Sequence, residues 1–417
     1  MSNETELAHI RQEEYQQRRR VNALRRQVYQ QTDPAASQSL LQELAEAEGA
    51  LASLEQQRMA LESTADSGVV ASLDKKSKPS GVLGAETTGL EATVYLRMAQ
   101  VPTAIYHLFD PEETPLVSCT VRNVGQQGKT RRLRFSSFID GYSATAVNTV
   151  EIKPNQEHTF NQLPTLYADA VAEIGEITRA TLNVLVEDLD AGSGAVELHT
   201  TYPIWLLART TAPLAVRDPK TGGWKDLTHY FGAFVTPNAP ALMRFLRTAA
   251  DRHPEKMLAG YQGDPSGVEP QVRAVYDALK SDAGITYVNS LMAFSPEEGA
   301  ANQRVRLPRE SLEHREANCI DGTVLFASLL EGISLNPAIV LVPGHAFVAW
   351  EGWQDSGEWH YLETTMIGSH SFDEAVASAQ ATAMQYEQMA QQQNNPMAFR
   401  RWPLSTLRAD YAITPME

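Results

Sequence analysis

The chain has 417 residues, enough for about two to four domains, and an ordinary globular balance of 43% hydrophobic and 21% charged residues. Its 51 acidic residues outnumber 35 Lys and Arg, giving a net charge of -16. That excess argues against nucleic acid or an anionic membrane as the main partner, because phosphate groups are bound by clustered cations. The only two cysteines, Cys119 and Cys319, are far apart in the chain, so neither a disulfide framework nor a zinc cluster is expected.

The same features predict a cytoplasmic protein. Two unpaired cysteines are typical of a reducing compartment. The N-terminus is charged from its first residues, unlike a signal peptide, and no apolar stretch is long enough to span a bilayer. We expect no metal and no cofactor.

Residues 1–65 have the pattern of an α-helical hairpin or coiled coil. Apolar residues recur at three- and four-residue intervals in two stretches, and Asp33-Pro34 separates them as a helix break followed by a new helix start. The first stretch is rich in Arg and the second in Glu, so the two helices should pack against each other. The apolar seam is thin, which leaves two interpretations open: a solvated structural hairpin, or a surface for self-association or a regulatory protein partner.

Residues 66–89 are rich in Gly, Ser and Lys, a composition typical of a flexible linker. Residues 90–212 then contain short alternating runs separated by turn residues, which predict an all-β sandwich. No catalytic cluster is evident in it, so we expect an interaction domain or a spacer. Cys119 falls inside one of these runs, and the simplest interpretation is a small buried hydrophobic side chain.

Residues 213–417 change to an α+β pattern. Amphipathic helices are predicted over 239–253 and 270–281, a helix follows Cys319, and strands are predicted around His345 and Glu363. A further helix is expected over 371–393. The last stretch, 400–416, is expected to fold back as extended chain.

Cys319 is the most informative residue in this region. Asn318 is a good N-cap residue and Asp321 lies three residues later, so the pair resembles a capping box that places Cys319 at the first helical position. The free N–H groups and the dipole of a helix N-terminus stabilise a thiolate, and the amide of Cys319 could donate to an oxyanion. Gly322 is costly inside a helix unless another group approaches closely.

A histidine and a glutamate complete the pattern. His345 begins an apolar run after Pro343-Gly344, and Glu363 lies near the end of the next run. Two antiparallel strands can bring these side chains together, although a register shift of one residue would move Glu363 to the other face. Thiol, imidazole and carboxylate in this order are what nucleophilic cysteine catalysis requires.

These segments resemble the transglutaminase-like branch of the papain-like cysteine protease superfamily. The resemblance rests on Cys319 at a helix start, on the motif His345-Ala346-Phe347 and on Glu363-Thr364-Thr365, and it covers about residues 230–380. The family pattern has Trp where this chain has Phe347, Asp where it has Glu363 and Pro where it has Thr364.

The resemblance implies a papain-like α+β domain with Cys319 as nucleophile, His345 as general base and Glu363 as the residue that orients the imidazole. The implied product is a thioester acyl-enzyme formed from a protein substrate. Candidates for a second oxyanion donor or for support of the thiolate are Asn318, Gln303 and Arg315, although Arg315 could simply pair with Glu316.

Three functions fit this pattern. The first is a regulated cytoplasmic cysteine protease; because related domains occur in bacterial conflict systems, analogy points to a bacterial defence effector. The second is transamidation or amide hydrolysis on the same triad. The third is an inactive scaffold that acts through protein–protein contacts.

Overall fold

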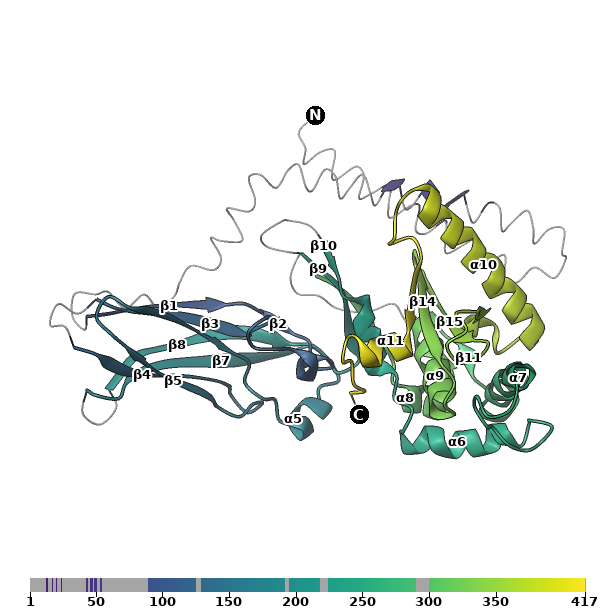
Figure 1. The fold of residues 1–417 in the computed structure, drawn as a ribbon, viewed down its shortest axis with the longest axis horizontal. Coiled ribbons are helices and arrows are strands. Elements are labelled where there is room, and N and C mark those ends of the chain that lie inside the picture. The colour runs from purple at the N-terminus through teal and green to yellow at the C-terminus, as the bar shows by residue number, and fades with distance from the viewer. Residues whose placement is uncertain are drawn as a thin grey trace. The chain divides into compact units, whose positions relative to one another are not determined.

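The computed structural model describes residues 89–416, except for 125–128, 192–194, 218–223 and 290–299, together with single positions between 13 and 54 (Figure 1). The chain divides into two compact units. One comprises Met1–Lys78 and Arg217–Lys225, and the other comprises Pro79–Val216 and Asp226–Glu417. The second unit therefore holds most residues of both the predicted β domain and the predicted α+β domain.

Only scattered positions are described in the predicted N-terminal hairpin, and all of them are helical. Leu24 and Ala47 are buried, and the side-chain amide of Gln17 donates a hydrogen bond to the carbonyl oxygen of Ala47 at 3.0 Å. Gln17 of the first predicted helix therefore contacts the second predicted helix. The rest of the hairpin and the predicted linker up to residue 88 lie outside the described residues.

Residues 90–206 form two β-sheets, as the alternating pattern predicts. In one, β3 lies between β1 and β6, and in the other the strand order is β2-β8-β7-β4-β5. The inward side chains of both sheets belong to one hydrophobic core, which includes Cys119. The elements are β1 Leu90–Leu96, β2 Gln100–Val101, η1 Tyr106–Leu108, β3 Val117–Asn123, β4 Arg131–Ile139, β5 Ala146–Ile152, β6 Glu157–Gln162, α5 Ala168–Ala172, β7 Thr178–Asp188 and β8 Ala195–Leu206.

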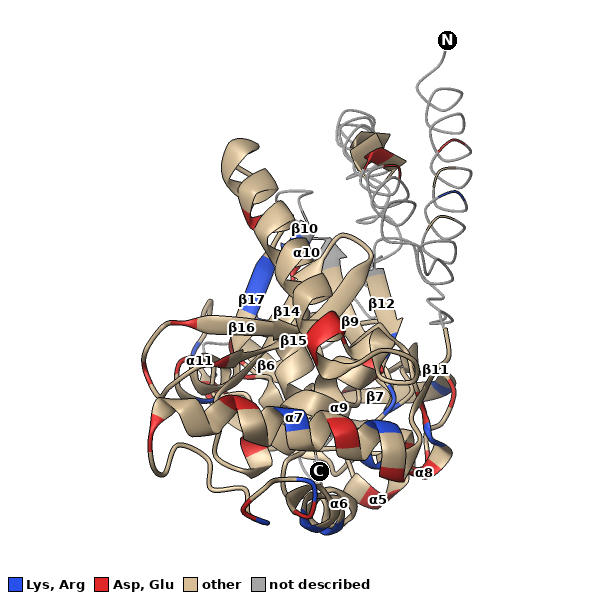
Figure 2. Ribbon diagram, turned by 90° about the vertical axis from the view of Figure 1, so that its right-hand side faces the viewer, with Lys and Arg blue, Asp and Glu red and all other residues tan. Residues whose placement is uncertain are grey.

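The C-terminal region is built on a four-stranded antiparallel sheet with the order β16-β15-β14-β17. Alternate residues of β15 point to opposite faces. Val348 and Trp350 join the core formed with α9, whereas Phe347 and Ala349 join a smaller core formed with α10. The four strands and both helices are labelled in Figure 2. The sheet and its two covering helices are β14 Pro337–Val342, β15 His345–Glu351, β16 Trp359–Leu362, β17 Arg400–Pro403, α9 Cys319–Gly332 and α10 Phe372–Gln392.

Shorter elements complete this region. Two small sheets have the orders β10-β9-β12 and β11-β13. Their strands and the remaining helices up to α8 are β9 Thr211–Arg217, β10 Trp224–Asp226, η2 Thr228–Phe234, α6 Pro240–Ala250, η3 Pro265–Gly267, α7 Val268–Ala278, η4 Leu279–Ala283, β11 Thr286–Tyr287, β12 Ala300–Arg304, α8 Pro308–His314 and β13 Glu316–Ala317. The chain thus has mixed α and β content distributed over several sheets. Among the described residues, no helix has both the length and the apolar character needed to cross a bilayer.

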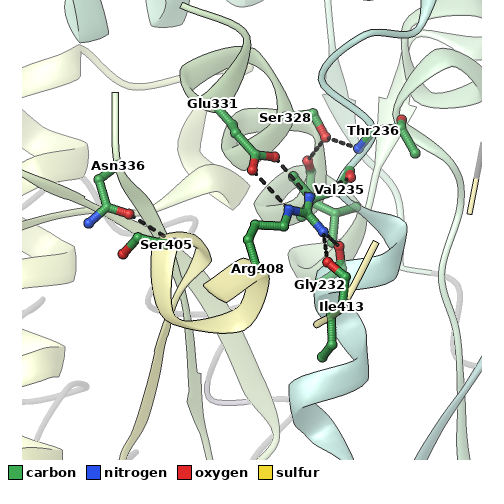
Figure 3. Close-up of polar contacts among 10 residues, drawn as sticks. Gly232, Val235, Thr236, Ser328, Glu331, Asn336, Ser405, Arg408 and Ile413 are labelled. Carbon is green, nitrogen blue, oxygen red and sulfur yellow. Dashed lines mark hydrogen bonds and ion pairs between the residues drawn. The ribbon is translucent and has the colours of Figure 1, made fainter. Parts of the chain in front are cut away.

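The expectation of a fully extended C-terminal stretch is wrong in part. Strand β17 is followed by a short helix, α11 Leu404–Ala409. Arg408 of this helix donates to both carboxylate oxygens of Glu331 on α9 and to the carbonyl oxygens of Gly232, Val235 and Ile413, at 2.8–3.0 Å (Figure 3). One guanidinium group therefore ties the C-terminal chain to the end of α9 and to η2, a long-range contact that local sequence pattern does not reveal.

Candidate active site

The first turn of α9 carries Cys319 at its first position, as the sequence pattern predicts. The side chain of Asn318 accepts a hydrogen bond from the amide of Asp321 at 2.8 Å, and the carboxylate of Asp321 accepts one from the amide of Asn318 at 3.2 Å. This reciprocal capping box fixes where the helix starts. The thiol of Cys319 is half-buried, and its amide belongs to the first turn, where N–H groups have no partner within the helix.

Cys319, His345 and Glu363 come together from three elements. The Nε2 atom of His345, the first residue of β15, lies 2.7 Å from Oε2 of Glu363. The thiol of Cys319 is near enough to the same imidazole to raise its pKa. Since Nε2 is engaged by the carboxylate, Nδ1 is the ring nitrogen left for the thiol. The imidazole side chain keeps 20% of its surface exposed and the carboxylate side chain 8%.

Strand register accounts for the meeting of His345 and Glu363. Val348 of β15 pairs with Leu362 of β16. Continuing this register by one residue places Glu363 opposite Phe347, which lies two residues from His345 on the same side of the strand. Diagonal neighbours in an antiparallel pair are within reach of long side chains, so the extra methylene of glutamate is accommodated here.

The second oxygen of Glu363 is held by Thr365. The amide and the hydroxyl of Thr365 donate to Oε1 of Glu363 at 3.0 and 2.7 Å. Glu363 is thereby the N-cap of a short helix, η5 Thr364–Met366. With one oxygen bound to this helix and the other bound to His345, the carboxylate has a defined orientation. Sequence reasoning identified Glu363 but assigned no role to Thr365.

Gly322 brings the α9 helix close to η5. A Cβ atom at Gly322 would lie 2.9 Å from Oγ1 and 3.0 Å from Cβ of Thr364, which is closer than such atoms approach. The hydroxyl groups of Thr323 and Thr364 both donate to the carbonyl oxygen of Cys319, at 2.7 and 3.4 Å. The glycine one turn from the thiol therefore permits the backbone that carries the nucleophile and the backbone that follows Glu363 to pack together.

The electrostatics of the His345–Glu363 pair favour its charged form. Burial opposes the imidazolium, but the carboxylate of Glu363 and the hydrogen bond with Cys319 outweigh it and raise the pKa of His345 to about 10. Burial also disfavours the carboxylate, yet the charge and hydrogen bond of His345 and the hydrogen bonds from Thr365 lower the pKa of Glu363. A positively charged imidazole beside a thiol stabilises the thiolate.

The three supporting candidates have different surroundings. Asn318 lies next to Cys319, but its side-chain oxygen is engaged in the capping box. Gln303 lies on β12 and its amide nitrogen donates to the carbonyl oxygen of Arg304. Arg315 is exposed and ends α8 in the left-handed conformation, with φ of 60°.

The alternative expectation that Arg315 pairs with Glu316 is wrong. The carboxylate of Glu316 binds Arg306 instead, with 2.6 Å between Nη2 and Oε1. Arg315, the residue immediately before Glu316, has a left-handed backbone conformation. The sequence gives no signal for Arg306, since nothing local marks it as a contact of the cysteine-bearing segment.

Among the residues that the structure describes, no three His, Cys, Asp or Glu side chains gather in a way that could hold a metal ion. The sequence matches no protein-family model, and no curated protein and no solved structure is significantly similar to it. The chemistry of the site must therefore be argued from its own geometry.

Proposed function

We propose that this chain is a cysteine hydrolase that cleaves peptide bonds through a Cys319–His345–Glu363 triad. The observation that carries the proposal is the 2.7 Å contact between Nε2 of His345 and Glu363, beside a Cys319 thiol that is near enough to raise the pKa of the same ring. A nucleophile, a base and a group that orients the base, each within hydrogen-bond reach of the next, are the signature of covalent acyl transfer.

The reaction follows from these positions. The thiolate of Cys319 attacks the carbonyl carbon of the peptide bond, and the electron pair of the C=O bond moves to the oxygen to give a tetrahedral anion. When that anion collapses, the C–N bond breaks, the leaving amine takes a proton from the imidazolium of His345, and a thioester remains on Cys319. Water then attacks the thioester while His345 accepts its proton. The C–S bond breaks, which releases the acid and restores the thiolate of Cys319 beside the imidazolium.

The transglutaminase-like, papain-like resemblance supports the same proposal. Its Cys and His positions coincide with the start of α9 and the start of β15, and Glu363 directly follows β16. Two differences from the family pattern, at Glu363 and Thr364, can be explained by contacts in the structure. Glu363 reaches the imidazole from a diagonal position, and Thr364, where the family has Pro, donates a hydroxyl to the carbonyl oxygen of Cys319.

The remaining regions fit a regulated enzyme in this proposal. Residues 90–206 supply a β-sandwich module, with two sheets over one core, as a docking surface for a protein substrate. The helical residues before 54 supply a surface for a regulatory partner or for self-association.

Labelling with iodoacetamide at pH 6, followed by intact mass, tests the proposal. The wild type and Cys119→Ala should each gain one adduct at similar rates, and Cys319→Ala should gain none. His345→Ala should react about 100-fold more slowly, in line with the usual contribution of a positioned base. Equal rates for wild type and His345→Ala would rule out the triad.

A second assay separates the reactions that the same triad could perform. Fluorogenic peptides report hydrolysis, and incorporation of a fluorescent primary amine into a glutamine-containing protein reports transamidation. Hydrolysis alone would support the proposal, amine incorporation in excess of hydrolysis would favour a transamidase, and an unreactive Cys319 would favour the scaffold.

A further inference from the structure

Three charged side chains surround the segment that leads into Cys319. Arg306 binds the carboxylate of Glu316 at 2.6 Å and donates through Nη1 to the carbonyl oxygen of Glu316 at 3.0 Å. The same Nη1 lies 3.8 Å from Oδ2 of Asp321. These contacts join β13, which precedes the cysteine, to α9, which follows it.

Asp321 is the centre of this network. Its side chain is almost fully buried, with 1% of its surface exposed. Oδ1 accepts a hydrogen bond from the backbone amide of Arg306 at 2.7 Å, and Oδ2 accepts one from the amide of Asn318 at 3.2 Å. One carboxylate thus holds two backbone segments that are separate in sequence against the N-terminus of α9.

A simple helix cap does not require this arrangement. An N-cap needs only one side-chain acceptor, whereas a buried carboxylate loses its hydration and must be compensated by partners. Burial raises the pKa of Asp321, and the amides of Arg306 and Asn318 and the charge of Arg306 oppose that rise. A buried carboxyl group and the guanidinium of Arg306 thus meet two residues from the nucleophile, where orientation of the backbone matters.

The constrained segment ends at the amide of Cys319. Both the carbonyl oxygen of Glu316 and the amide of Asn318 are bound by the network. The peptide plane between Asn318 and Cys319 comes next, and the N–H of Cys319 is at the first helical position. An oxyanion donor is effective when it is preorganised at the position where the negative charge develops.

We propose that Arg306, Glu316 and Asp321 are positioning residues that orient the backbone N–H of Cys319 as an oxyanion donor. This inference rests on the proposed acyl-transfer function and assigns that function a supporting network. It separates two properties of one residue: the reactivity of the thiol, which depends on His345, and the alignment of the amide, which depends on the network.

Two reactions of the same cysteine test the inference. Iodoacetamide is attacked at a saturated carbon and forms no oxyanion, whereas p-nitrophenyl acetate is attacked at a carbonyl and does. Asp321→Asn keeps the size of the side chain but removes its charge. We expect it to label with iodoacetamide within about 3-fold of the wild-type rate and to release p-nitrophenol in the acylation burst about 100-fold more slowly.

Two further variants complete the design. Arg306→Gln leaves the capping box and the backbone amide of residue 306 intact, but it removes the ion pair with Glu316. It should therefore fold even where Asp321→Asn does not. It should show the same selective loss of acylation. Arg309→Ala is the matched control. Arg309 lies three residues after Arg306, on α8, and its side chain is 50% exposed, 3.8 Å from Glu310. This control should keep both rates.

Parallel losses of alkylation and acylation in folded Asp321→Asn or Arg306→Gln protein would show a merely structural cap and overturn the inference. Unchanged acylation in both variants would overturn it as well. A wild-type protein whose Cys319 reacts with neither reagent would instead remove the proposed function, and this inference with it.

Discussion

The two cysteines of this chain occupy opposite environments. Cys119 lies on β3 inside an apolar core with no exposed surface, and burial raises the pKa of its thiol to about 12. Cys319 begins a helix, is half-buried and is near an imidazole that is itself held by a carboxylate. The same side chain is therefore an inert packing group in one region and a candidate nucleophile in the other.

The difference lies in what surrounds each sulfur atom. A thiolate needs nearby positive charge or N–H donors, and an apolar sheet interior supplies neither. The start of α9 supplies the helix N-terminus, and β15 supplies the imidazole. Four substitutions and two control variants test this contrast.

The largest effect is expected from removing each of the two sulfur atoms in turn. Cys319→Ala should abolish peptide hydrolysis and leave thermal stability close to wild type, because the thiol contributes little to the core. Cys119→Ala should leave hydrolysis unchanged and lower the free energy of unfolding by about 1 kcal/mol, because it opens a small cavity. Activity assays and denaturant melts of both variants would measure this. A stability loss in Cys319→Ala and none in Cys119→Ala would reverse our account.

Glu363→Gln should bring the surroundings of Cys319 closer to those of Cys119 by removing a charge. The amide can still contact His345 but no longer favours the imidazolium, so hydrolysis should fall about 100-fold or more. The pKa of His345, about 10 in the wild type, should fall, and the alkaline limb of the alkylation rate should move to lower pH. Thr365→Val keeps the charge of Glu363, so its alkaline limb should stay near the wild-type position.

Glu363→Gln should also change how the stability of the fold depends on pH. The pKa of His345 is raised from 6.5 to about 10 on folding, so its stabilising contribution is complete below pH 6.5 and is lost as pH rises towards 10. The pKa of Glu363 is lowered from 4.5, so its contribution is present above that pH and is lost as pH falls through the folded value. The stability difference between wild type and Glu363→Gln should be largest between pH 4.5 and 6.5, as thermal melts over pH would show. A difference that grows above pH 8 would contradict the pairing.

Gly322→Ala tests geometry without touching a triad residue. The new methyl group would lie 2.9 Å from the hydroxyl oxygen of Thr364, so η5 and Glu363 must shift by a fraction of an ångström relative to α9. We expect hydrolysis to fall about 10-fold to 100-fold. Gly267→Ala is the control, because a Cβ atom there meets nothing within 4 Å. Full activity in Gly322→Ala would show that η5 adapts without cost.

Local pattern was sufficient for much of the secondary structure. The start of α9 follows from Asn318 and Asp321 as a capping box, and helices α6, α7 and α10 follow from their spacing of apolar residues. These features depend on residues within one or two turns of each other, which is why the sequence alone predicts them.

Strand alternation likewise predicted the β region between 90 and 206. The burial of Cys119 followed from its place in one alternating run, since side chains of a paired strand point to opposite faces. The order of the strands and their division between two sheets did not follow, because pairing partners are chosen by contacts across the whole region.

The tertiary structure decided what local pattern left open at the site. The register between β15 and β16 puts Glu363 on the side of His345, and the contact of Gly322 with Thr364 joins elements that are far apart in the chain. The contacts of Arg306 with Glu316 and of Arg408 with Glu331 could not be predicted from local pattern. Arg408 lies on α11, a helix where extended chain was expected.

The physical reason is the range of the interactions. Capping, helical periodicity and strand alternation arise from neighbouring residues, so the sequence by itself determined that Cys319 starts a helix, that His345 starts a strand and that Glu363 follows one. Register, close backbone approach and buried ion pairs arise when distant segments pack. Only the folded chain could therefore bring thiol, imidazole and carboxylate together, bind the carboxylate to Thr365 and tie Asp321 to Arg306.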